Sequence, residues 1–128
     1  MRLHAFVVAL AMSIAAPASA TAQCMQDNQP DQIAEGTLSL GQFEEAAGRP
    51  EQAYILTLPV PACLSSSDAD SAVGSTTTIH IYSFDSPVSE AFEGLIGQSV
   101  QVRGSPLGAH TAHHHAPIVM DVSRIDAI

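Results

Sequence analysis

The sequence contains no lysine, and its four arginines stand against thirteen aspartates and glutamates in 128 residues. The formal net charge at pH 7 is therefore −9. Proteins that bind nucleic acids rely on lysine and arginine contacts with the phosphates, so this charge excludes a nucleic-acid partner. It also argues against an anionic membrane surface as a binding partner.

The chain also lacks common catalytic motifs. No serine lies in a Gly-x-Ser-x-Gly elbow, and there is no His-Glu-x-x-His helix. Glu44 and Glu45 are adjacent on an expected strand, so they point to opposite faces of the sheet. Glu90 and Glu93 lie early in an expected helix, where the helix dipole favours anions. We therefore name no catalytic residue and expect no enzymatic activity.

Long apolar runs are scarce. The longest, AFVVALAMSIAA near the N-terminus, is shorter than the roughly 20 residues that cross a bilayer. It follows a positively charged start and precedes the sequence Ala-Ser-Ala, which is typical of a signal peptide cleaved after residue 20, or after residue 22 in a second frame. The residues before Cys24 lack a lipoprotein pattern. We expect an exported protein, periplasmic or extracellular, with no membrane insertion after cleavage of residues 1–20 or 1–22.

Cysteine is limited to Cys24 and Cys63. In an oxidising compartment, two cysteines favour a disulfide over two free thiols. This bridge would contribute about 3 to 4 kcal/mol by closing a loop of about 40 residues. We expect it to tie down an N-terminal extension, residues 21–32, that shows no periodicity.

Five later segments show the hydrophobic pattern of β-strands. They cover residues 36–43, 53–60, 76–84, 98–104 and 118–128. The apolar residues expected to face inward in the last two are Val100, Val102, Ile118, Met120 and Val122. Gly41 predicts a bulge that brings Phe43 to the face of Leu38. Pro59 and Pro61 are expected to end the second strand, because proline donates no hydrogen bond to a sheet.

The hydrophobic period changes between the third and fourth segments. Residues 86–97 predict a short helix, with Ser86 at the N-cap, proline in the first turn and Gly97 at the end. Its apolar face combines Val88, Phe92 and Leu95.

These elements predict a mainly β protein. Five strands with a helix between strands 3 and 4 is the order of an oligonucleotide/oligosaccharide-binding (OB) barrel, so we expect a small antiparallel OB-like barrel over residues 33–128. The bend at Gly41 supports a barrel, because the first strand must serve both halves. A small antiparallel sandwich or an open sheet would give almost the same pattern.

Several short sequences resemble a bacterial family of small exported proteins, domain of unknown function 4431. The shared features are Pro-x-Cys at residues 61–63, Val-x-Val-x-Gly at residues 100–104, and a Thr-x-His-His segment at residues 111–114. The chain departs from the family by its third consecutive histidine, His115, and by its lack of basic residues. The resemblance implies the compartment and the fold, but no activity.

The segment HTAHHH holds four of the six histidines. If the chain is extended there, His113 and His115 project to one face while His114 points away. A turn before them would bring His110 to the same point. Neutral imidazole is a common ligand of zinc and copper, so these three residues are the candidate metal ligands. His114 is a further possible ligand, and His80 would join only if the third strand lies beside the loop.

Other roles for these histidines remain open. They could cap backbone groups or pack on neighbouring rings. They could sense pH, because imidazoles that gain charge below about pH 6.5 would be attracted to an acidic surface and would tighten the loop's contacts. A metal-activated water on the histidines is the one route to catalysis that the sequence offers.

The sequence therefore leaves two hypotheses. The first is an exported, non-enzymatic binding module for a protein, a glycan or a small ligand, with no cofactor. The second is a periplasmic protein that binds zinc or copper through the segment from His110 to His115.

Overall fold

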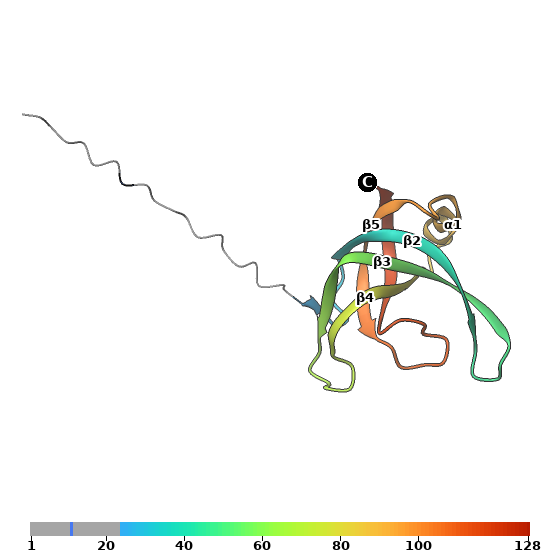
Figure 1. Ribbon diagram of the computed structural model, residues 1–128, viewed down its shortest axis with the longest axis horizontal. Coiled ribbons are helices and arrows are strands. Elements are labelled where there is room, and N and C mark those ends of the chain that lie inside the picture. The colour runs from blue at the N-terminus through green and yellow to red at the C-terminus, as the bar shows by residue number, and fades with distance from the viewer. Residues whose placement is uncertain (1–10, 12–23) are drawn as a thin grey trace, which may run out of the picture.

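The computed structural model describes Ala11 and residues 24–128 (Figure 1). The predicted signal peptide, residues 1–20 or 1–22, lies outside the described residues except for Ala11. No helix in the described part of the chain is long and apolar enough to cross a membrane.

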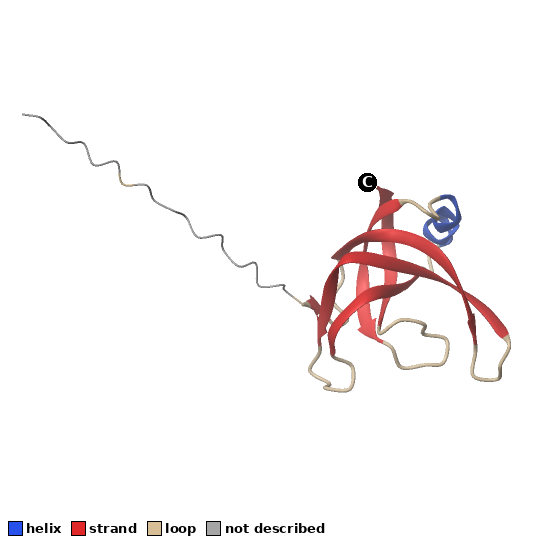
Figure 2. Cartoon of the chain, in the orientation of Figure 1, coloured by secondary structure: helices blue, strands red, loops and turns tan. Residues whose placement is uncertain are grey.

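Six strands and one helix make up the described chain (Figure 2). In chain order they are β1 (Met25–Gln26), β2 (Gln32–Glu44), β3 (Pro50–Ser65), β4 (Val73–Tyr82), α1 (Ser86–Gly94), β5 (Ser99–Gly108) and β6 (Ile118–Ala127). Five of these strands coincide with the five predicted segments. Most are longer than predicted, and the two-residue strand β1 was not predicted.

The five long strands close into a barrel. β2 pairs with β3 and β5, β3 pairs with β4, and β5 pairs with β6, all in antiparallel fashion. The ring closes through β4 and β6, which are parallel. The prediction of a purely antiparallel barrel was therefore wrong. A closed ring of five strands cannot alternate in direction all the way round, because five is an odd number, so one neighbouring pair must be parallel.

The helix lies between β4 and β5. It was predicted between strands 3 and 4, and β1, which precedes the other strands, accounts for the difference. Its N-cap is Asp85, whose carboxylate accepts a hydrogen bond from the Val88 backbone N–H at 3.3 Å. Ser86, the predicted N-cap, is instead the first helical residue. The predicted apolar face is confirmed, since Phe92 is buried and Val88 and Leu95 pack against the core.

Pro59 and Pro61 lie inside β3 and do not end it. The pairing of β3 with β2 stops at Thr57, and its pairing with β4 is irregular between Thr57 and Ala62. Both prolines therefore occupy an interval where the ladder hydrogen bonds are interrupted, and their missing N–H groups cost nothing there.

The predicted bulge at Gly41 does not form. β2 pairs with β3 in unbroken register from Thr37 to Glu44. Phe43 therefore stays on the face opposite to Leu38. Its ring lies over Gly41, where a Cβ atom would meet the Phe43 ring. The glycine is thus needed to let an aromatic ring pack on the outside of the hairpin.

Aliphatic side chains fill the barrel. The five residues predicted to face inward on β5 and β6 are all buried, which confirms their orientation. Phe92 adds its ring from α1, in a T-shaped arrangement with Tyr54 at a centroid distance of 5.2 Å. The predicted disulfide between Cys24 and Cys63 is present, and β1 pairs beside it with the end of β3.

The hairpin of β2 and β3 extends beyond the barrel. β2 pairs with β5 only up to Thr37, and β3 pairs with β4 only from Tyr54 onward. The remainder, up to the turn at residues 45–49, is a two-stranded ribbon that projects from the barrel (Figure 1). The loop between β5 and β6 runs beside it.

Candidate functional site

The outer face of the β2–β3 hairpin carries a second, small apolar cluster. Ala53 and Ile55 of β3 are buried there against Ala116, which belongs to the loop at residues 109–117. Phe43 of β2 packs against the same cluster. These positions are outward-facing because side chains alternate along a strand. The loop therefore covers part of the outside of the barrel and forms its own contacts with the ribbon.

Glu51, at the start of β3, joins the loop to the ribbon. One carboxylate oxygen accepts a hydrogen bond from His113 Nδ1 at 2.6 Å, and the other accepts one from His115 Nε2 at 2.7 Å. The His115 side chain is only 8% exposed and stacks on Phe43 at 4.3 Å between centroids. The prediction that His113 and His115 project to one face of the loop is consistent with this arrangement. The sequence analysis did not identify Glu51 as their shared partner.

Two further histidines accept hydrogen bonds from the loop backbone. His80 Nδ1 accepts from the His115 N–H at 3.2 Å, and His114 Nδ1 accepts from the His110 N–H at 3.0 Å. In the neutral form of each ring the proton must then be on Nε2. Both rings therefore fix the loop conformation, and each presents an N–H donor at its other nitrogen.

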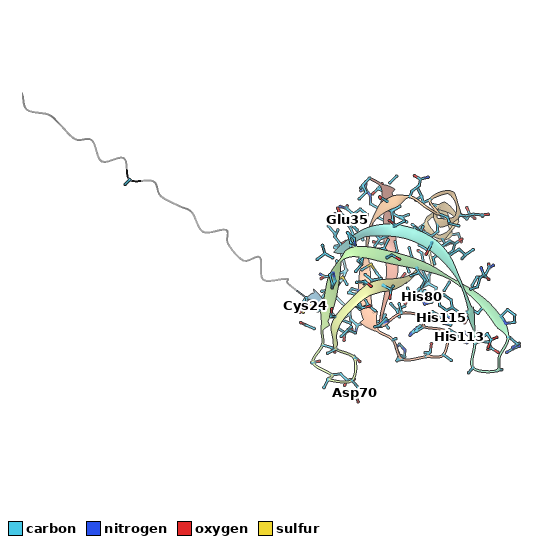
Figure 3. The ribbon with its side chains drawn as sticks, in the orientation of Figure 1. Cys24, Glu35, Asp70, His80, His113 and His115 are labelled. Carbon is cyan, nitrogen blue, oxygen red and sulfur yellow. A yellow bond between two sulfur atoms is a disulfide. The ribbon has the colours of Figure 1, made fainter. Side chains whose placement is uncertain are left out.

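The candidate metal ligands divide into two groups. His113 and His115 meet at Glu51, and the ring of His80 lies 5.7 Å from that of His115 (Figure 3). His110 instead contacts His114, at 4.7 Å between centroids. Among residues 24–128 and Ala11, no three His, Cys, Asp or Glu side chains are grouped so that they could hold a metal ion.

The electrostatics of the cluster favour the neutral forms of His80 and His114 and the charged form of Glu51. Burial and the neighbouring imidazoles lower the pKa of His80 and of His114. The hydrogen bonds from His115 and His113 lower the pKa of Glu51. The pH-sensing hypothesis predicted that acid would tighten the contacts of the loop. The lowered pKa values of His80 and His114 point the other way, because the folded protein disfavours the charged forms of these two rings.

A shallow pocket of about 320 Å³ opens where β3 and β4 separate. Its lining consists of Glu51, Gln52, His80, Tyr82, Phe84, His113 and His114. Phe84, just after β4, is 86% exposed and contacts Tyr82 edge to face at 5.4 Å. Phe84 thus places a large, exposed apolar side chain at the lining of the pocket, where a ligand could contact it. The sequence analysis missed Phe84 and Gln52, although Phe84 ends an expected strand.

The fold and the site define a class: a small, disulfide-bonded, mixed β-barrel with a histidine-rich loop against its outer face. The model of one protein family, described as Domain of unknown function (DUF4431), matches residues 78–126. That stretch runs from within β4 into the last residues of β6, and it is similar to this family, as the resemblance predicted. It includes the histidine loop but not Glu51 or the ribbon. No curated protein is similar enough to the chain to match it.

Proposed function

We propose that this chain is an exported, non-enzymatic binding module and that the pocket between β3 and β4 is its binding site. The observation that carries the proposal is the position of the exposed aromatic pocket in the barrel. Among the five long strands, β3 and β4 are the second and third, and OB barrels bind ligands on the face of those strands. The pairing order of the strands supports an OB-like assignment.

The two loops that border the site support the same assignment. In OB barrels the loop between the first two strands and the loop between the last two flank the ligand. Here these are residues 45–49 and residues 109–117. Glu51 and the histidines connect the two sides at one edge of the pocket, so the rim is held in place before a ligand arrives. Such preorganisation lowers the entropic cost of binding.

Export is part of the proposal. The N-terminal pattern of charge, apolar run and small residues is typical of a signal peptide. The disulfide between Cys24 and Cys63 fits an oxidising compartment outside the cytosol.

The test is a mapping experiment with three probes: an arginine-containing hexapeptide, its glutamate counterpart and a neutral trisaccharide of N-acetylglucosamine. Each is titrated into isotopically labelled protein while backbone amide shifts are recorded. At least one probe should give saturable shifts at Gln52, Tyr82 and Phe84, with none at Val60, an exposed apolar residue of the distal half of β3. If no probe shifts the pocket amides, or if Phe84→Ala leaves the binding constant unchanged, the pocket is not the binding site.

A zinc or copper site is the second candidate, and Glu51 is the observation that favours it. Its carboxylate already joins two imidazoles, one at each oxygen. A metal ion would have to replace those hydrogen bonds. Calorimetric titration with zinc or copper, repeated for the double variant H113A/H115A, tests this alternative. Micromolar or tighter affinity that is lost in the variant supports it, and equal, weak affinity in both proteins eliminates it.

A further inference from the structure

Five rings form a continuous row on the outer face of the barrel. The centroid distances between successive rings are 4.3 Å from Phe43 to His115, 5.7 Å to His80, 6.3 Å to Tyr82 and 5.4 Å to Phe84. The first rings are covered by the loop and the ribbon. The last, Phe84, is 86% exposed and also lines the pocket. Its π face is available to a ligand, and aromatic faces attract cations within about 6 Å.

One carboxylate lines the pocket, and two others belong to residues next to Tyr82 or Phe84. Glu51 lines the pocket, and its hydrogen bonds keep it ionised. Asp121 pairs with Tyr82 across β4 and β6. Burial raises the pKa of Tyr82, and the nearby Asp121 carboxylate raises it further. Asp85 directly follows Phe84 in the chain. The field at the pocket is therefore negative, which repels phosphate and carboxylate ligands.

The arginines of the described chain do not offset this charge. Arg49 is bound to Glu45 at 2.7 Å, and Arg124 is bound to Asp126 at 2.7 Å. Arg103 is paired with Arg124 in the β5–β6 ladder, several residues from the strand ends that carry the histidine loop. No arginine or lysine lines the pocket.

We infer that the pocket accepts a cationic side chain, an arginine or a lysine presented by a basic peptide segment of a partner. The cation would lie against the faces of Tyr82 and Phe84, with the Glu51 carboxylate as its counter-ion. This rests on the proposed function and names the ligand chemistry for the same site. Charge complementarity is the argument for a basic partner, and the exposed rings determine where it is bound.

The experiment measures affinity for the arginine hexapeptide Ac-(Gly-Arg)₃-NH₂ at about pH 8, where histidine side chains carry little charge. Two variants of Phe84 separate a cation–π contact from simple apolar contact. Phe84→Leu keeps an apolar side chain and removes the aromatic face. A cation–π contact predicts that F84L and F84A both weaken binding by about 2- to 6-fold. An apolar contact predicts a loss in F84A only, and that result would overturn the inference.

Gln52 supplies the electrostatic test, because it lines the pocket and is exposed enough to substitute without unfolding the protein. Gln52→Glu should strengthen binding of the arginine peptide, and Gln52→Lys should weaken it. Val60→Ala is the matched control and should change neither. Raising the salt concentration to about 1 M should reduce the difference between the two Gln52 variants, since it shortens the Debye length to about 3 Å.

The outcomes distinguish this inference from the function on which it rests. If the trisaccharide shifts the pocket amides and the arginine peptide does not, the cationic inference fails while the binding site stands. The same conclusion follows if the glutamate peptide binds as tightly as the arginine peptide. If none of the probes shifts the pocket amides, both proposals fail.

Discussion

Replacing Phe43 with alanine removes the ring that holds the histidine loop against the ribbon. The ring stacks on His115 with an angle of 8° between the planes and packs in the small cluster with Ala53, Ile55 and Ala116. It contributes nothing to the main barrel core, which lies on the opposite face of the strand. We therefore expect a local loss of stability confined to residues 109–117.

The magnitude follows from the burial of the ring. A fully buried phenylalanine costs about 3 to 5 kcal/mol when truncated to alanine. Phe43 is only partly buried, so about half of this, roughly 2 kcal/mol, is expected. Every 1.4 kcal/mol corresponds to about a tenfold change in an equilibrium constant. The open population of the loop should thus rise about 30-fold.

Amide hydrogen exchange measures this opening directly, because the loop has its own protected amides. The N–H groups of His110, His114 and His115 are each hydrogen-bonded within the site. Their exchange should accelerate in Phe43→Ala, while amides of Val100 and Met120 in the barrel keep their rates. Phe84→Ala, which removes an exposed ring, serves as the control and should leave the loop unchanged. Loop rates within about threefold of the wild type, or equal acceleration throughout the barrel, would refute this account.

Three further predictions concern stability. The folded-state pKa values of His80 and His114 are lowered, so the protein should lose stability as the pH falls below the ordinary histidine value of 6.5. Urea unfolding at about pH 7.5 and 5.5 should show this loss of unfolding free energy. The loss should be smaller in His80→Gln. Replacing Cys24 and Cys63 with serine should lower the unfolding free energy by about 3 to 4 kcal/mol in the same assay, and an unchanged value would mean that the bridge does not constrain the unfolded chain. Gly104→Ala would bring a Cβ atom against the backbone of Asp121. The thermal midpoint should therefore fall, by an amount equivalent to about 1 to 3 kcal/mol of unfolding free energy. A midpoint equal to that of the wild type would contradict this close approach.

Local patterns account for what the sequence predicted well. The alternation of Val100 with Val102, and of Ile118 with Met120, specifies which face of each strand is buried, because side chains point to opposite faces at successive residues. The helix face with Phe92 follows from a period of 3.6 residues in the same way. These signals need no knowledge of neighbouring strands.

The errors at Gly41 and at the two prolines have a common cause. A bulge or a strand end depends on the partner strand, which the local pattern does not specify. The prolines are tolerated in β3 because the ladder is already interrupted beside them, and Phe43 stays on the outer face because the loop with Ala116 arrives there to cover it.

The sequence by itself determined the places of the five long strands, the helix face, the disulfide and the negative charge, since each depends on composition or on residues near one another in the chain. The tertiary structure decided the parallel closure of the barrel and the composition of the site. Glu51 and His113 are 62 positions apart, and Tyr82 meets Asp121 only across the β4–β6 pair. Contacts of this kind arise from the path of the chain through space, which is why a histidine-rich loop predicted the place of the site but not its carboxylate or its exposed rings.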